Sequence, residues 1–289
     1  MIAPPGHCVQ TMTDRVPYLA SGLDAWSVMP PWILICWSLT FQTVNSASVP
    51  LWATMLVGAG VWLVYLADHY TAPPEDAVNA PGRAIWLTGL KKWIPAIIAV
   101  TIALRAGIML QVWMRYWFAA LILPGAVLAM VGSSTIVHRW PNLRLMWVAG
   151  MWTFATWLPW IPWTSSSSIP IAWLGLMGAM FGANVLLCDY ADATGDHQVG
   201  RSDRLPHPAW PYGLGVLAAV SMVFLWRESP WPSVLPTLLG SGGILGLAFH
   251  QFSRPLHGFH QKFRADVTLA LGSALVFGLS LALSMAERT

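Results

Sequence analysis

Long stretches without a formal charge dominate the chain. No Asp, Glu, Lys or Arg occurs in residues 25–67 or 145–188, and each stretch is long enough for two membrane-spanning helices of about 20 residues. Shorter apolar stretches, the first of them broken only by Arg105, are residues 93–114, 116–138, 205–226, 229–253 and 267–286. The pattern therefore predicts nine transmembrane helices.

Turn-forming residues set the expected helix ends. Pro and small polar residues favour a turn over continued helix, and they divide the two longest stretches at residues 45–50 and 164–170. The expected helices are residues 27–45, 50–68, 93–112, 116–133, 145–163, 171–190, 208–226, 231–250 and 267–286. Because these helices follow one another with only short connections, we expect residues 1–289 to form a single all-α integral membrane domain.

The composition agrees with a membrane protein. The chain is 56% hydrophobic and 9% charged, with a mean hydropathy of +0.58, whereas about a quarter of the residues of a soluble domain are charged. The net charge of +3 lacks the basic stripe that nucleic acid requires. The three cysteines form no CxxC pair, so neither a disulfide framework nor a cysteine zinc site is indicated.

The basic residues are distributed unequally between the two sides of the predicted bundle. Cytoplasmic loops of membrane proteins carry the excess of Lys and Arg. The side with the excess holds Arg15, Arg83, Lys91, Lys92, Arg139, Arg144, Arg201, Arg204, Arg254, Lys262 and Arg264. We therefore expect a multi-pass protein with a cytoplasmic N-terminus and cytoplasmic loops after the second and sixth helices. An odd number of spans places the C-terminus on the opposite side.

Acidic residues gather at two predicted cytoplasmic helix ends. Asp189, Asp192 and Asp196 are spaced i, i+3 and i+7, which places their carboxylates on one helix face. Stacked like charges repel unless they share a cation. Mg²⁺ prefers oxygen ligands and completes its shell with water and phosphate oxygens, so the triad predicts a Mg²⁺-diphosphate site. Asp68 ends another helix on the same side. The alternative is a solvated helix end at the membrane surface.

The segment after this helix resembles a known family. Residues 189–200, DYADATGDHQVG, followed by Leu205 and Pro206, are similar to the second aspartate-rich motif of the UbiA superfamily of intramembrane prenyltransferases, typically DxxDxxGD with a downstream glycine and a Leu-Pro pair. The resemblance implies a helical bundle around a central cavity, a Mg²⁺-bound prenyl diphosphate, and transfer of the prenyl group to an aromatic or other lipid-soluble acceptor in the membrane.

The resemblance also implies roles for individual residues. The expected Mg²⁺ ligands are Asp68, Asp189, Asp192 and Asp196, and among them Asp68, Asp192 and Asp196 are the expected catalytic residues. The expected diphosphate-binding residues are Arg83, Lys91, Lys92 and Arg201. Asn184 lies on the same predicted helix as Asp189, deeper in the membrane. It offers either a carbonyl ligand or a hydrogen bond to another helix. Trp62, Tyr65, Trp86 and Tyr190 either stabilise an allylic cation or anchor and pack the helices.

The first motif of the family is incomplete in this chain. The family's second helix usually ends NxxxDxxxD, and aligning the middle Asp with Asp68 places Val64 and Ala72 at the other two positions. His69 stands where an arginine commonly follows. The alternative function is therefore a non-catalytic protein of the same fold that binds a lipid, quinone or pigment. A transporter would need ionisable groups near the bilayer midplane, whereas these acids lie at one surface.

Overall fold

A computed structural model describes most of the predicted membrane region. It covers residues 22, 26–45, 49–71, 81–103, 140–163, 171–198, 206–228, 234–253 and 259–286. In these ranges the chain is helical apart from short turns, and no strand occurs among them. The expected all-α fold is therefore confirmed.

Most of the predicted helices coincide with helices of the structure. The described elements are α2 (Met29–Val44), α3 (Leu51–Thr71), α5 (Pro81–Leu90), α7 (Pro141–Trp157), the 3₁₀ helix η1 (Leu158–Trp163), α8 (Ile171–Gln198), α9 (Trp210–Glu228), α10 (Leu235–Ser253) and α11 (Phe259–Ala286). The helix expected at residues 93–112 is helical over Ile94–Ala103, and its remainder, like the helix expected at 116–133, lies outside the described residues. The short helix α5 was not predicted.

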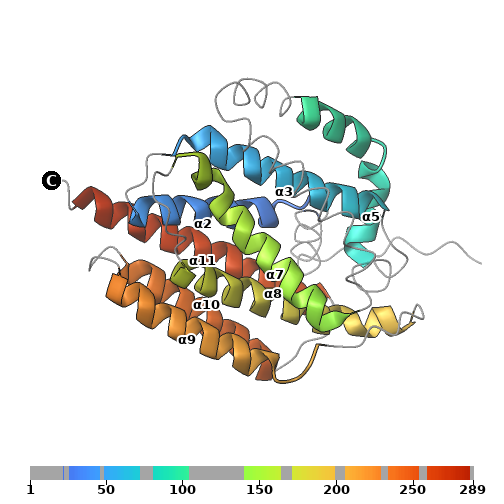
Figure 1. The fold of residues 1–289 in the computed structure, drawn as a ribbon. Coiled ribbons are helices and arrows are strands. Elements are labelled where there is room, and N and C mark those ends of the chain that lie inside the picture. The colour runs from blue at the N-terminus through green and yellow to red at the C-terminus, as the bar shows by residue number, and fades with distance from the viewer. Residues whose placement is uncertain are drawn as a thin grey trace, which may run out of the picture.

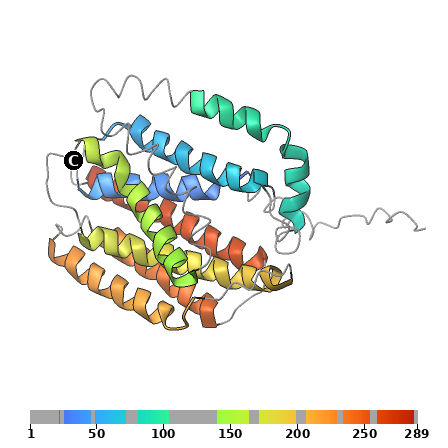
Figure 2. The same cartoon turned by 45° about the vertical axis from the view of Figure 1, so that its right-hand side comes forward.

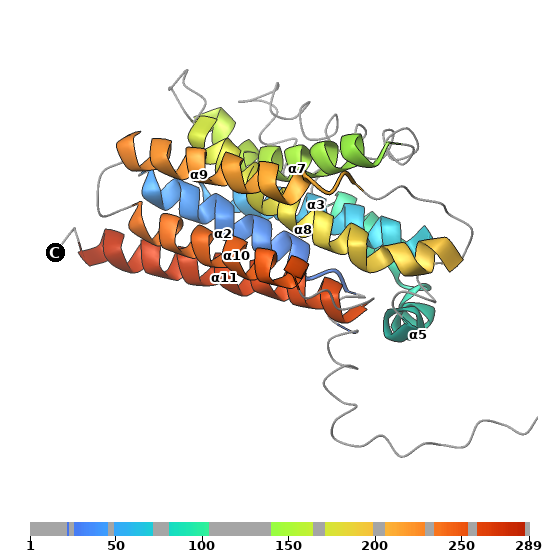
Figure 3. The ribbon, with the colours of Figure 1, turned by 90° about the horizontal axis from the view of Figure 1, so that it is seen from below.

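The long helices run side by side in one bundle with α8 near its centre. Helix α8 packs against α7, α9, α10 and α11, while α2 packs between α3 and α11 (Figure 1). In all three views α3 and α8 finish at the same end of the bundle, where α7 and α11 begin and where α5 lies (Figures 1, 2 and 3). This end, which contains the last turns of α3 and α8 with Asp68 and Asp196, is called the acidic end below.

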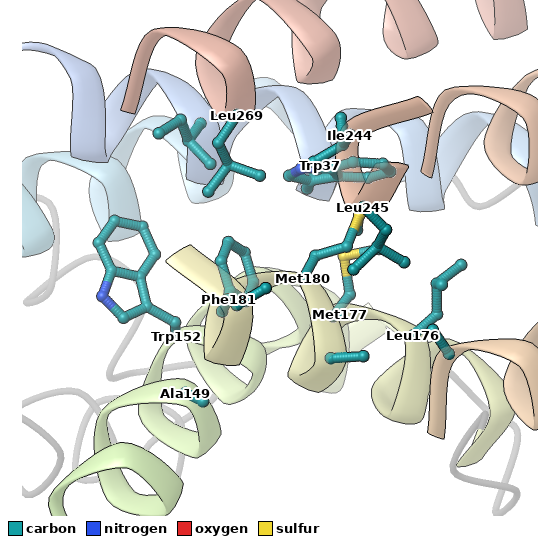
Figure 4. Close-up of a cluster of buried hydrophobic side chains, with 14 of the residues drawn as sticks. Trp37, Ala149, Trp152, Leu176, Met177, Met180, Phe181, Ile244, Leu245 and Leu269 are labelled. Carbon is teal, nitrogen blue, oxygen red and sulfur yellow. The ribbon is translucent and has the colours of Figure 1, made fainter. Parts of the chain in front are cut away.

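Large aromatic and aliphatic side chains fill the middle of the bundle. Trp37 and Trp173 are fully buried, and their rings meet edge to face with centroids 6.3 Å apart. The ring of Trp152 on α7 lies 5.8 Å from that of Tyr65 on α3. It lies 5.3 Å from the ring of Phe181 on α8 (Figure 4). Each such aromatic pair adds about 0.5 to 1.5 kcal/mol beyond its burial. Helix α7 therefore connects α3 to α8.

Glycines allow helices to approach closely on two sides of the bundle. A Cβ atom added to Gly182 of α8 would lie 2.8 Å from a methyl group of Leu214 on α9. A Cβ atom on Gly240 of α10 would overlap Val276 of α11. Small residues at such contacts let two helix backbones pack together. Gly182 and Gly240 thus serve helix packing.

Several helices suit a lipid environment. Within α8 and α11, Ile171–Ala191 and Phe263–Ala286 are long and apolar enough to cross a membrane, and a third span forms if Gly82–Leu90 and Ile94–Ala103, which meet at a 68° bend, count as one. Large apolar side chains are exposed along α9, among them Val216, Phe224 and Trp226. The chain is therefore a membrane protein by helix length and composition. The nine-helix transmembrane bundle and its orientation stay predictions.

Candidate functional site at the acidic end

Helix α8 carries the whole predicted aspartate triad. It continues to Gln198, about two turns beyond the end expected at residue 190. Because the helix is unbroken, the i, i+3, i+7 spacing of Asp189, Asp192 and Asp196 places their Cα–Cβ bonds on one face. The side chain of Asp189 is described; those of Asp192 and Asp196 lie outside the described side chains.

Asp189 forms an ion pair with a residue of the preceding helix. Its side chain is 8% exposed, and its Oδ1 lies 3.3 Å from Nη2 of Arg144, whose side chain is 32% exposed. Arg144 lies in the first turn of α7, which begins with Pro141. A buried carboxylate requires a charged or hydrogen-bonding partner, because burial removes its water shell. Arg144 therefore neutralises part of the negative charge that the triad concentrates.

Arg144 was counted only in the charge bias of the loops and was not predicted as a site residue. The spacing argument compares residues along a single helix, so it cannot identify a partner on another one. The available signal was its place as a basic residue in the first turn of a helix. Cations are unfavourable there because the helix N-terminus carries a partial positive charge, so a compensating acid is expected nearby.

Asp68 lies in the last turns of α3, at the acidic end. Its side chain, like those of His69 and Ala72, lies outside the described side chains. The ends of α3 and α8 are connected through α7, because Tyr65 of α3 contacts Trp152 and Arg144 of the same helix pairs with Asp189. The convergence of Asp68 with the α8 triad on one ion stays a prediction.

The predicted diphosphate-binding residues occupy two separate places. Arg83, in the first turn of α5, is 4% exposed, whereas Lys91 and Lys92 are exposed in the turn after that helix. About 12 Å of helix axis separates Arg83 from Lys91, at about 1.5 Å per residue. The ammonium group of Lys92 lies 5.7 Å from the ring centroid of Trp93. Arg201 lies outside the described residues.

Asn184 makes a hydrogen bond between helices. Its Nδ2 donates to Oδ1 of Asp266 on α11 at 3.2 Å, and the Cys188 thiol lies 3.7 Å from its Oδ1 as a weak donor. Asn184 and Asp189 are five positions apart, which turns their side chains about 140° from each other around α8. Of the two roles that the sequence left open for Asn184, the structure therefore supports the contact between helices.

The aromatic residues near the acidic helix ends take part in packing. Trp62 donates its Nε1–H to the carbonyl oxygen of Trp26 at 2.8 Å. The ring of Tyr190 meets Phe252 of α10 with centroids 6.3 Å apart. Tyr65 contacts Trp152, and Trp86 packs on the small cluster of Leu66, Leu87 and Ile94. These contacts favour the structural role for all four candidates.

The donor set at the acidic end suits Mg²⁺ in kind, because carboxylate oxygens are its preferred protein ligands. Within the described part of the chain, no three His, Cys, Asp or Glu side chains are close enough to hold a metal ion. That part contains the side chain of Asp189 and not those of the other three expected ligands. Comparisons with models of protein families, with curated proteins and with solved structures found no match to this chain.

Proposed function

We propose that the chain is a Mg²⁺-dependent intramembrane prenyltransferase of the UbiA type. It binds a prenyl diphosphate at the acidic end and transfers the prenyl group to a lipid-soluble, aromatic acceptor within the membrane. The chief support is that α8 stays helical through Gln198 at the same end of the bundle as the last turns of α3 (Figures 1 and 3). Asp68, Asp189, Asp192 and Asp196 are thereby carried by two helices that finish on one side.

In this proposal, Asp68, Asp189, Asp192 and Asp196 would hold Mg²⁺, and the bound ion would supply positive charge for the diphosphate leaving group. Arg144, which pairs with Asp189, would add positive charge beside the diphosphate. Its Nη2 atom pairs with the carboxylate, and the Arg144 side chain is 32% exposed. A guanidinium has five N–H donors, so others can bind phosphate oxygens. Arg83, buried at the acidic end, adds a second positive charge. These groups act most strongly where negative charge develops in the transition state.

The reaction needs no strong nucleophile from the protein. The allylic carbon–oxygen bond breaks, its electron pair leaves with the diphosphate, and the acceptor forms a new bond to the allylic carbon and loses a proton. The apolar helices exclude water, which would otherwise capture the allylic cation. The bundle thus supplies the dry medium, and its acidic end supplies the charges.

The experiment is diphosphate release by the purified protein, supplied with prenyl diphosphates of several chain lengths and a set of aromatic acceptors. Release that requires Mg²⁺ and is lost in Asp192→Asn supports the proposal. Glu228→Gln is the matched control, since it removes a carboxylate at the end of α9, away from the acidic end. Release that persists without Mg²⁺, or equally in Asp192→Asn, overturns it.

A second candidate is a non-catalytic protein of the same fold that binds a lipid, quinone or pigment. Val64 and Ala72 favour it, because they stand where two further metal ligands of the first motif are expected. In that case the purified protein retains a hydrophobic ligand in the absence of Mg²⁺, and no prenyl diphosphate is consumed. Extraction and identification of co-purified ligand, with and without chelator, separates the two candidates.

A further inference from the structure

Helix α5 lies across the acidic end and does not run along the bundle. It crosses the direction of the long helices, and Figure 3 shows it end on (Figures 1, 2 and 3). The chain then bends by 68° between Gly82–Leu90 and Ile94–Ala103. Because membrane-spanning helices end where the membrane meets water, a helix that lies across those ends runs along the membrane surface.

One face of α5 packs inside the protein and the other is exposed. Leu87 of α5 is 3% exposed and packs with Leu66 of α3. Arg83, one turn earlier, is buried on the same face. The exposed residues of α5 and the turn after it, spaced i, i+3 and i+7 on the other face, are Ile85, Thr88 and Lys92. The exposed face therefore combines an apolar side chain with a positive charge.

The turn between α5 and Ile94–Ala103 consists of Lys91, Lys92 and Trp93, and is called the elbow below. All three side chains are exposed, Trp93 by 59%. The Lys92 ammonium group lies 5.7 Å from the ring centroid of Trp93. Ile85, on the same face as Lys92, is 66% exposed. The elbow thus places two positive charges next to exposed apolar surface.

Charge and apolar exposure together indicate the partner. Lys side chains near a membrane surface attract lipids with negatively charged headgroups, and Trp side chains collect where headgroups meet acyl chains. A free phosphate or diphosphate ion would satisfy the lysines and leave Trp93 and Ile85 in water, where exposed apolar surface is unfavourable. A phospholipid offers a phosphate to the lysines and an apolar boundary to the other two side chains.

We infer that the elbow binds the negatively charged headgroup of a membrane phospholipid. The ammonium groups of Lys91 and Lys92 contact its phosphate oxygens, and Trp93 lies where the headgroup meets the acyl chains. The two lysines thereby take a role different from the diphosphate contact that the sequence leads one to expect. Bound lipid would hold α5, and with it the buried Arg83, at the acidic end.

The test is titration of the purified full chain, in detergent micelles, with phosphatidylglycerol or phosphatidylcholine of the same acyl chains. Native mass spectrometry counts the bound lipid. Each lysine at a negatively charged surface strengthens binding about fivefold. We expect one saturable site that prefers phosphatidylglycerol about thirtyfold. The preference should weaken at high salt, because salt screens exposed charges, and inorganic phosphate should not displace the lipid.

Lys92→Gln should reduce the preference about fivefold, and the double variant Lys91→Gln/Lys92→Gln should lose it. Both lysines are exposed, so these variants should unfold at the wild-type midpoint. Arg227→Gln is the matched control, because Arg227 ends α9 beside Trp226, another exposed tryptophan next to a basic residue, away from the acidic end. It should keep the site and its preference.

Equal wild-type affinities for the two lipids overturn the inference, as does a preference that survives in the double variant. An equal loss in Arg227→Gln also overturns it, because the lysines would then act only through the net charge. Neither the aspartates nor a prenyl diphosphate enters this inference. Its failure is therefore distinguishable from failure of the proposed function, which Asp192→Asn tests.

Discussion

The ion pair between Arg144 and Asp189 yields a quantitative prediction. Replacing Arg144 with Met keeps most of the apolar stem and removes the positive charge 3.3 Å from the Asp189 carboxylate. Two unit charges at that distance attract by about 5 kcal/mol at an effective dielectric constant of about 20. Desolvation and the partial exposure of Arg144 offset most of this, since exposed pairs contribute about 0 to 1 kcal/mol.

The expected loss of stability for Arg144→Met lies between the values for exposed and buried pairs. Removing one partner of a fully buried pair costs about 3 to 5 kcal/mol, because the other charge is left uncompensated. The side chain of Asp189 is 8% exposed and that of Arg144 is 32% exposed, so we expect a decrease of about 1 to 3 kcal/mol in the free energy of unfolding.

The assay is equilibrium unfolding in mixed detergent micelles, followed by circular dichroism, for Arg144→Met, Asp189→Asn and the double variant. Neutral Asn no longer requires the arginine, so the double variant should be more stable than the sum of the single effects predicts, with a coupling of about 1 kcal/mol or more. Arg227→Met is the control, since Arg227 is exposed at the end of α9. A coupling near zero, or equal effects of Arg144→Met and Arg227→Met, would refute the reasoning.

Packing predictions follow from the glycines and the aromatic core. Gly240→Ala should lower the free energy of unfolding by about 1 to 3 kcal/mol, because the added Cβ would overlap Val276. Gly242→Ala, whose added Cβ would meet no atom within 4 Å, should leave the stability unchanged or raise it by up to about 1 kcal/mol. Equal effects of the two variants in unfolding titrations would contradict this prediction. Trp152→Ala should lower the free energy of unfolding by about 3 to 5 kcal/mol, because Trp152 is buried. Trp226→Ala should lower it much less, because Trp226 is exposed. Equal unfolding midpoints for the two variants would contradict the interior position of Trp152.

The positions of the helices could be predicted from the sequence, but their ends could not. Uncharged stretches of about 20 residues locate a membrane helix, and seven described helices overlap such stretches: α2, α3, α7, α8, α9, α10 and α11. Because charged residues mark the predicted helix ends, the sequence predicts that α8 ends at residue 190 and that α11 begins at residue 267. The observed helices reach Gln198 and begin at Phe259, because charged side chains do not break a helix where they extend into the interface.

The helix register of the candidate site could be predicted, but its contacts between helices could not. The 3.6-residue period is local, so the shared face of Asp189, Asp192 and Asp196 follows from spacing once α8 is helical. The partners Arg144 and Asp266 come from α7 and α11. Their places depend on how the helices pack, which the charge pattern of one chain does not determine. Helix α5 was missed because ten residues are too few for a span.

The central claim is that Asp68 of α3 and the α8 triad act on one Mg²⁺-diphosphate complex. Its most direct measurement is the affinity of an unreactive prenyl thiodiphosphate for the wild type, Asp68→Asn, Asp192→Asn and the double variant, with and without Mg²⁺. The account predicts that Mg²⁺ tightens wild-type binding at least about tenfold, or about 1.4 kcal/mol. Each single variant should lose most of this gain in affinity, and the double variant should lose little more than either single variant. Wild-type affinity independent of Mg²⁺, or wild-type behaviour of Asp68→Asn, would contradict it.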